Sequence, residues 1–325
     1  MNDKILITGA GGFIGSHLVE ELLLKGNKVK AFVRYNSRNN WGWLDGLSNL
    51  QNLEIVTGDI RDYDSVNNSL KDCHSVFHLA ALIGIPYSYI SPLAYIKTNI
   101  EGTYNVIESA RKLNLKNIIV TSTSETYGTA QYTPIDEKHP SVGQSPYSAS
   151  KISADEISLS YYRSFDLPVK VVRPFNTYGP RQSARAIIPS IIIQLLNKKD
   201  EIELGNLSPV RDLTYINDTV NGFIEIYDSN KLFGEATNIG SGTGISIQNL
   251  YNLICDIMKV KPVLLIQEER IRAEKSEVQN LICNISKLKE NSKWGIQYPL
   301  EEGLVKTIEW IKNNQSFYKD NIYNI

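Results

Sequence analysis

The segment Thr8–Gly15 (TGAGGFIG) constrains the fold of this chain more than any other. It follows the apolar run Lys4–Thr8, which is typical of a buried strand, and opens Phe13–Lys25, whose apolar residues recur at helical spacing. A glycine loop between a strand and a helix lets backbone N–H groups approach a pyrophosphate, and the helix N-terminus adds partial positive charge. A tight strand-to-helix turn is the plainer interpretation, but this context favours a dinucleotide site. The residues predicted to contact the cofactor here are Gly9, Gly12, Phe13, Ile14 and Gly15.

Strands and helices alternate through the first half of the chain. The clearest predicted helices are Thr98–Leu113 and Pro146–Phe165. Such alternation predicts a Rossmann-like α/β fold with a doubly wound parallel sheet. Besides the first strand, the predicted strands cover residues 29–33, 53–57, 75–79, 117–121 and 168–172.

The pattern changes after Arg173, where prolines divide the chain into shorter pieces. Helices are predicted at 187–196, 218–228 and 245–258, mixed with short strands. We therefore predict a dinucleotide-binding domain over residues 1–175 and a smaller α+β substrate lobe over 176–325. The boundary is soft, because a strand at 235–240 is equally compatible with the first domain.

Composition excludes several classes of protein. The 325 residues carry 34 basic and 35 acidic side chains, a net charge of −1, so no nucleic-acid partner is expected. No apolar run is long enough to cross a membrane. The three cysteines, Cys73, Cys255 and Cys283, are far apart and form no CxxC pair. We accordingly predict a cytoplasmic location and no metal site.

A candidate catalytic pair lies at the start of the second long helix. Tyr147 and Lys151 form a YxxxK pattern, and the four-residue spacing places both side chains on one helix face. A nearby ammonium is expected to lower the pKa of the tyrosine and favour the phenolate that accepts a proton. Thr123 follows a predicted strand end and supplies a hydroxyl group.

The second strand bears on the choice of nicotinamide cofactor. An acidic residue at its end would bind the ribose 2′-hydroxyl of NAD. The chain instead continues as VRYNSR, and Arg34 and Arg38 suit a 2′-phosphate. This favours NADP, with NAD as the alternative; solvent-facing loop charges are the other interpretation.

Several segments resemble the extended short-chain dehydrogenase/reductases, in the NAD-dependent epimerase/dehydratase family. These are the GxxGxxG loop, Gly58–Asp62, His78–Ala81, Thr121–Gly128, Arg173–Arg181 and Arg211–Ile216. The resemblance implies that Asp59 and Ile60 contact the adenine side of the cofactor and that Ala80 and Ala81 lie beside it. It also implies that Thr123 binds a substrate oxygen next to Tyr147. Asn176 and Arg211 would bind the sugar diphosphate.

Glu125 narrows the expected reaction. A 4-epimerase needs only the hydroxyl, the tyrosine and the lysine, whereas a 4,6-dehydratase also needs a base for the C5 proton. The segment Thr123–Gly128 (TSETYG) resembles the signature of nucleotide-sugar 4,6-dehydratases. Ser124 agrees with the GDP-mannose branch, and Thr126 replaces the usual apolar residue. Glu125 would serve as base and then acid, with Ser124 relaying the proton; a surface glutamate is the plainer alternative.

Two further segments, 32–44 and 182–189, resemble the branch acting on nucleoside-diphosphate N-acetylglucosamine, which includes legionaminic-acid-pathway and configuration-retaining enzymes. Members of that branch are commonly NAD-dependent, which conflicts with the arginine argument. Trp41 and Trp43 fit either loop packing or a substrate-side role. The resemblance adds four candidate substrate contacts, Arg185, Arg270, Arg272 and Glu277.

The sequence thus predicts an enzyme that converts UDP- or GDP-N-acetylglucosamine to its 4-keto-6-deoxy derivative. The resemblance implies a tightly bound NADP or NAD and a homodimer. A 4-epimerase of the same superfamily is the alternative. The nucleotide and the configuration at C5 stay open.

Overall fold

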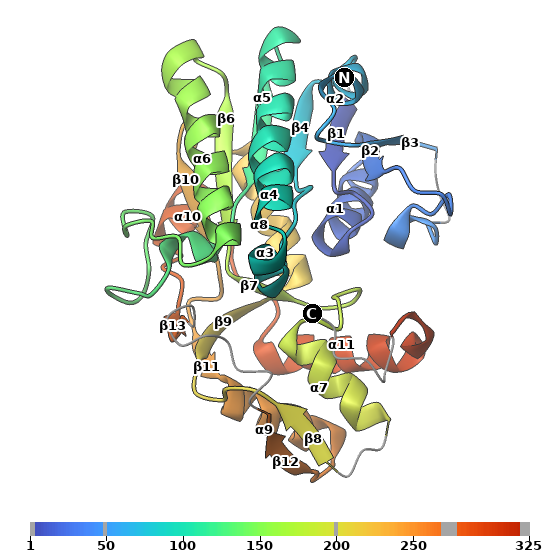
Figure 1. Ribbon diagram of the computed structural model, residues 1–325, viewed down its shortest axis with the longest axis vertical. Helices are drawn as coiled ribbons and strands as arrows, with labels where there is room; N and C mark the ends of the chain where they lie inside the picture. The colour runs from blue at the N-terminus through green and yellow to red at the C-terminus, as the bar shows by residue number, and fades with distance from the viewer. Residues whose placement is uncertain (1–3, 48–50, 198–200, 268–277, 319–325) are drawn as a thin grey trace.

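The structure is a computed structural model that describes residues 4–47, 51–197, 201–267 and 278–318. It consists of a large sheet with helices on both faces and a smaller lobe at one end of that sheet (Figure 1). Within the described residues, no helix is both long and apolar enough to cross a membrane.

Seven strands form one all-parallel sheet in the order β10-β6-β5-β4-β1-β2-β3. Most residues of these strands are buried, because helices cover both faces, and the strands are therefore nearly continuous apolar runs. The edge strand β3 is less deeply buried. The predicted doubly wound parallel sheet is confirmed. The strands are β1 (Lys4–Thr8), β2 (Lys28–Arg34), β3 (Leu53–Gly58), β4 (Ser75–His78), β5 (Asn117–Thr121), β6 (Val169–Pro174) and β10 (Ala236–Ile239).

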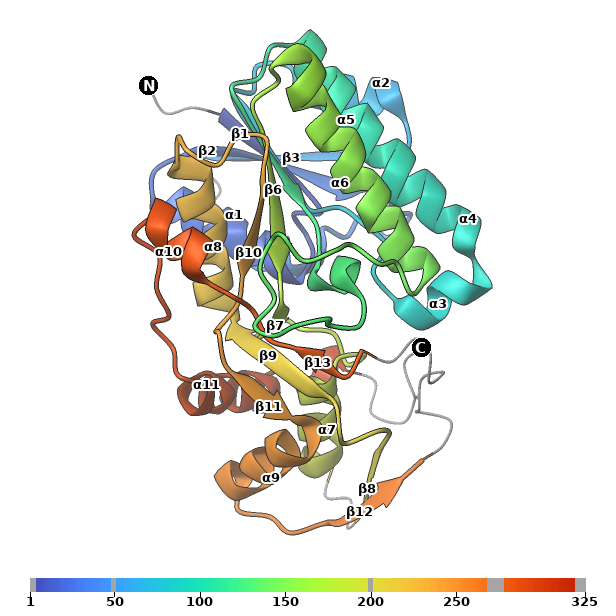
Figure 2. The ribbon, with the colours of Figure 1, turned by 90° about the vertical axis from the view of Figure 1, so that its left-hand side faces the viewer.

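Two groups of helices cover the sheet (Figure 2). Helices α1 (Phe13–Leu24) and α8 (Ile216–Asp228) pack on one face, with the larger of the apolar cores beneath them. Helices α2 (Tyr63–Leu70), α5 (Gly102–Lys112) and α6 (Pro146–Phe165) cover the other face. Both α8 and β10 come from the second half of the chain, so the polypeptide returns to the sheet after entering the smaller lobe.

The smaller lobe lies beyond the carboxyl ends of the parallel strands (Figure 1). Its central strand β9 (Val210–Tyr215) pairs with β7 (Asn176–Tyr178), β11 (Gly244–Ser246) and β13 (Asn280–Leu281). The smaller lobe thus mixes helices with short strands, as predicted, and its role in substrate binding stays a prediction. Its other elements are β8 (Glu201–Leu204), β12 (Val263–Ile266), α7 (Ile187–Leu196), α9 (Ile247–Met258), α11 (Leu300–Asn313) and, beside β10, α10 (Ser286–Asn291).

The helix expected from Thr98 begins differently in the structure. The short helices α3 (Ile85–Ile90) and α4 (Pro92–Tyr95) run into a π-helix, η2 (Ile96–Glu101), before α5 starts. The Thr103 hydroxyl donates to the carbonyl of Asn99 at 2.6 Å within this wider turn. The side chain of Asn99 hydrogen-bonds the backbone of Leu82 and donates to the Ser150 hydroxyl at 2.9 Å. Tertiary hydrogen bonds thus accompany a local geometry that the periodic pattern does not show.

Side chains from both lobes meet near α1. Arg181 donates to Glu20 Oε1 at 2.7 Å and to the Ser16 hydroxyl at 3.1 Å. Trp43 packs edge-on against Trp310, with ring centroids 5.4 Å apart. Of the two interpretations of Trp43, the structure supports packing.

Candidate active site

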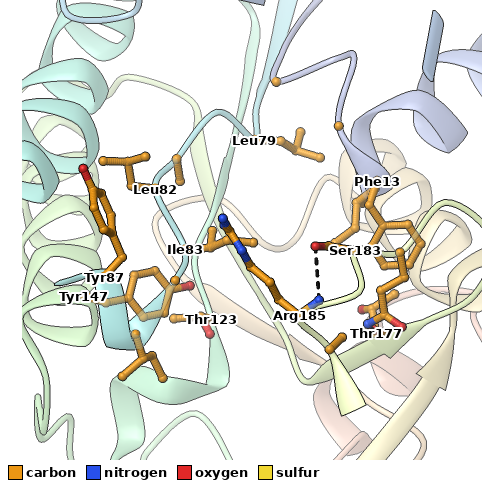
Figure 3. A pocket seen from close by; sticks show the side chains of 18 of the residues that line it. Phe13, Leu79, Leu82, Ile83, Tyr87, Thr123, Tyr147, Thr177, Ser183 and Arg185 are labelled. Carbon is orange, nitrogen blue, oxygen red and sulfur yellow. Dashed lines mark hydrogen bonds between the residues drawn. The ribbon is translucent and has the colours of Figure 1, made fainter. Parts of the chain in front are cut away.

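A cavity of about 1520 Å³ lies between the sheet and the smaller lobe (Figure 3). It begins at the glycine loop, passes the carboxyl ends of the parallel strands and ends among residues of β8 and β9. In open α/β sheets ligands bind at this edge. All five glycine-loop residues predicted to contact a cofactor line the cavity.

The glycine loop is compact because the loop after β4 presses against it. Gly9 has φ +70°, and a Cβ placed on it would lie 2.8 Å from the backbone nitrogen of Ala80. Gly12 donates its backbone N–H to Gly9 O at 3.0 Å. No side chain caps the N-terminus of α1. The uncapped N–H groups of its first turn are therefore available to a phosphate group.

A buried hydrogen-bond chain fixes the two loops against each other. Thr8 Oγ1 accepts the N–H groups of Leu79 and Ala80, each at 3.1 Å, and lies 2.8 Å from His78 Nδ1. His78 Nε2 lies 3.1 Å from the Thr103 hydroxyl. Burial lowers the pKa of His78 to about 3, so the ring is neutral. The sequence analysis missed this chain; its signal was a histidine at the end of an otherwise apolar strand.

The end of β2 provides cations and no carboxylate. Arg34 lines the cavity, whereas Arg38 is exposed and does not. Asp59 lines the cavity after β3, and Arg61 forms a bidentate ion pair with it that lowers the pKa of the carboxyl. Ile60, Ala80 and Ala81 line the same region. With the crowded Gly9 and the uncapped α1, these residues fit a dinucleotide.

The predicted catalytic residues come together. Thr123, Glu125, Tyr147 and Lys151 line the cavity, and Figure 3 shows Tyr147 and Thr123 pointing toward one another. Burial raises the pKa of Tyr147, and its hydrogen bond with Thr123 opposes that rise. The charge of Glu125 is close enough to raise this pKa further. The site therefore holds a neutral phenol beside a carboxylate.

Lys151 is expected to lower the pKa of Tyr147, but the net shift in the structure has the opposite sign. The pKa of Tyr147 is raised rather than lowered, because the phenol is fully enclosed. Lys151 donates from Nζ to the carbonyl of Thr121 at 2.6 Å. Burial lowers the pKa of Lys151 to about 8, and Asp155 opposes that change.

Asp155 belongs to a buried polar cluster that the sequence analysis also missed. It lies one helical turn after Lys151 and is 1% exposed. Its Oδ2 accepts from the Ser122 hydroxyl at 2.7 Å and from Arg173 Nη2 at 2.9 Å. The four-residue spacing after Lys151 was a readable signal, because it places the carboxylate on the face of the helix that carries the lysine.

Ser124 does not join the cavity lining. It is buried at 3% exposure behind Thr123 and Glu125, which both line the cavity. The structure thus brings Glu125 to the site and leaves Ser124 outside it.

Three predicted substrate contacts line the far part of the cavity: Asn176, Arg185 and Arg211. Asn176 Oδ1 is buried with no hydrogen-bond partner among the described residues. Figure 3 shows the Arg185 side chain extending into the cavity. Arg211 Nη1 donates to Val210 O at 3.1 Å. The other predicted contacts, Arg270, Arg272 and Glu277, lie outside the described residues.

A family model described as GDP-mannose 4,6 dehydratase matches residues 6–307. The chain belongs to this family. The resemblance to extended short-chain dehydrogenase/reductases is thereby confirmed, and the site is that of an enzyme of the NAD-dependent sugar epimerase/dehydratase superfamily.

Relatives of this chain differ in activity. A UDP-N-acetyl-alpha-D-glucosaminuronate decarboxylase of Bacillus cytotoxicus is 32% identical over 96% of this chain and 98% of its own. The structure of a UDP-N-acetylglucosamine 4-epimerase from Methanobrevibacter ruminantium M1 in complex with UDP-N-acetylmuramic acid has a TM-score of 0.86 and 30% identity, covering 96% of this chain and 99% of that one. The structure of dTDP-glucose 4,6-dehydratase from Bacillus anthracis in complex with NAD has a TM-score of 0.85 and 27% identity, covering 97% and 98%.

Proposed function

We propose that this enzyme is a nucleotide-sugar 4,6-dehydratase that converts UDP- or GDP-N-acetylglucosamine to its 4-keto-6-deoxy derivative. The observation that carries the proposal is the place of Glu125. Its carboxylate lines the cavity beside Tyr147, where a second proton acceptor is needed for loss of water and not for epimerisation.

Tyr147 and Thr123 act at the C4 hydroxyl of the hexose. The Thr123 hydroxyl binds the C4 oxygen. The phenol of Tyr147 first loses its proton to solvent, and the phenolate then takes the C4 hydroxyl proton as C4 becomes a ketone. A nicotinamide dinucleotide, when bound, supplies reversible exchange of a hydride with the sugar. Lys151, whose Nζ donates to the carbonyl of Thr121, supplies positive charge that favours the phenolate of Tyr147 during turnover.

Glu125 acts at C5. The C4 ketone acidifies the C5–H bond, and the carboxylate removes that proton. The C6–O bond then breaks, and the hydroxyl leaves as water after receiving a proton from Glu125. Hydride returns to C6 and C5 receives a proton from solvent. The net change is redox-neutral: C4 is oxidised to a ketone, C6 is reduced to a methyl group and one water is lost.

We assign cofactor binding to the glycine loop, Asp59, Ile60, Ala80 and Ala81, with Arg34 at the ribose end. NAD is the cofactor of solved relatives. Arg34 and the absence of an acid at the end of β2 favour NADP. Tight binding is expected, because the cofactor is regenerated in each turnover. Recovery of neither dinucleotide from the denatured enzyme would contradict that expectation.

We also propose a homodimer formed through the helices on the α5 and α6 face. Apolar side chains stand exposed there on the segment from α3 to α5, including Ile90, Leu93 and Ile96, all at least half exposed. A monomer by light scattering would contradict this proposal.

A 4-epimerase is the second candidate, because a solved epimerase of UDP-N-acetylglucosamine shares the fold and 30% of the sequence. Its chemistry leaves the C5 proton and the C6 hydroxyl in place. Glu125 would then have no role in turnover.

The substitution Glu125→Gln tests the assignment. It keeps the shape of the side chain and removes the base, so water loss should fall by roughly 100-fold or more. Glu101→Gln, an exposed change outside the cavity lining, is the matched control and should keep the full rate. Full dehydration by the Glu125→Gln enzyme would contradict the proposal.

A further inference from the structure

The loop after β4 presents one isoleucine to the cavity from a rigid support. Asn99, 1% exposed, accepts the N–H of Leu82 at 2.8 Å and donates to its carbonyl at 2.9 Å. The Tyr95 hydroxyl donates to Gly84 O at 2.5 Å. Ile83 therefore lies between two residues that buried side chains hold in place.

Ile83 and Tyr87 leave an apolar surface uncovered. Ile83 is 70% exposed and Tyr87 is 44% exposed, and both line the cavity. The ring of Tyr87 lies 6.2 Å from that of Tyr95, which lies 6.2 Å from the ring of Tyr147. Tyr95 is buried and does not line the cavity, so it connects the rings of Tyr87 and Tyr147 from behind the wall. Exposed apolar groups held in a cavity wall usually contact a ligand.

A cation faces the same corner of the cavity. Figure 3 shows Arg185 reaching from the smaller lobe toward the side of the cavity that carries Ile83. Its charge is close enough to Tyr95 to oppose the rise that burial causes in the pKa of that phenol. Its guanidinium is a donor that suits a carbonyl oxygen.

We propose that Ile83, Tyr87 and Arg185 form the subsite for an acetamido group at C2 of the hexose, an inference that rests on the proposed function. The acetamido methyl packs on Ile83 and Tyr87, and its carbonyl oxygen accepts from Arg185. Only one ring carbon separates C2 from C4, whose hydroxyl meets Tyr147. A substituent on C2 therefore falls within reach of the wall beside Tyr147. A plain C2 hydroxyl leaves that wall uncovered.

The test compares substrates with and without the acetamido group. Wild-type enzyme and the variants Ile83→Thr and Tyr87→Ala are given N-acetylglucosamine and glucose, each carried on the nucleoside diphosphate that the wild type uses faster. Loss of apolar contact should lower the ratio of the two kcat/KM values, N-acetylglucosamine over glucose, by roughly tenfold. Both side chains are substantially exposed, so folding should survive; unchanged melting temperatures check this.

Tyr89 provides the matched control. It lies on the same helix, α3, is 48% exposed and does not line the cavity. Tyr89→Ala should leave the ratio unchanged. Suppose that the wild type dehydrates the N-acetylglucosamine substrate, but Tyr87→Ala and Ile83→Thr both show the wild-type ratio of kcat/KM values. The subsite is then wrong and the proposed function stands. If the wild type prefers the glucose substrate, the proposed substrate fails and the subsite fails with it.

Discussion

Lys151 illustrates how one buried charge depends on its neighbours. Its ammonium is enclosed by the protein, which lowers its pKa to about 8, and Asp155 on the same helix holds the pKa up. Neutral His78 and the phenol of Tyr147 are its other titratable neighbours. A lysine that must stay protonated loses its charge as pH rises through its folded pKa. Activity should therefore fall on the alkaline side near pH 8.

The change Asp155→Asn removes the charge that supports Lys151. The alkaline limb of the kcat profile should then move to lower pH by roughly one unit. Glu156→Gln removes the same charge from the next position of α6, where the carboxylate is exposed and pairs with Arg163 at 3.2 Å. That control should keep the wild-type profile. A loss of rate that is equal at every pH would show a structural role for Asp155 and contradict this account.

Sequence and structure agree where the determinants are local to the site residues. The spacing of Tyr147 and Lys151 and the position of Glu125 place them at the cavity correctly. The pKa of Tyr147 could not be predicted, because it depends on enclosure by segments distant in sequence. Ser124 lies between two lining residues, and Arg38 lies two positions from Asn36 and Asn40, yet neither lines the cavity.

At the scale of helices and strands, the predicted bounds match the structure where the sequence near the ends of an element specifies them. Helix α6 has the predicted bounds because Ser145 forms a capping box with Ser148 and a proline opens the first turn. The π-helix η2 was missed, because the tertiary hydrogen bonds of its Asn99 side chain leave no mark in the hydrophobic pattern.

The glycine loop after β1 has no room for a side chain at Gly9. Gly9→Ala should abolish most cofactor binding, because a Cβ would press on Ala80 and the loop would have to move. Gly26 also has positive φ, +82°, but nothing lies within 4 Å of its added Cβ. Gly26→Ala should cost about 1 kcal/mol of unfolding free energy from backbone strain alone. Calorimetric titration of each variant with NAD or NADP measures the dissociation constant, which should rise for Gly9→Ala and stay unchanged for Gly26→Ala. Equal affinity in both variants would contradict the role given to the loop.

At the scale of the whole molecule, two lobes share one cavity. Arg181 and Trp43 join them near α1, while Arg185 and Arg211 reach the cavity from the smaller lobe. The α/β pattern predicted the sheet and the position of the site at its edge. It could not predict that α8 and β10 return to the sheet from the second half, because a parallel strand at 235–240 fits either lobe by its residues alone.

The most direct test of the central claim is proton NMR of the purified enzyme with UDP- and GDP-N-acetylglucosamine in deuterated buffer. The account predicts a new methyl signal from C6, deuterium at C5 and a faster reaction with one of the two nucleotides. A product that keeps its C6 hydroxymethyl group and C5 proton but is inverted at C4 would contradict it and identify an epimerase.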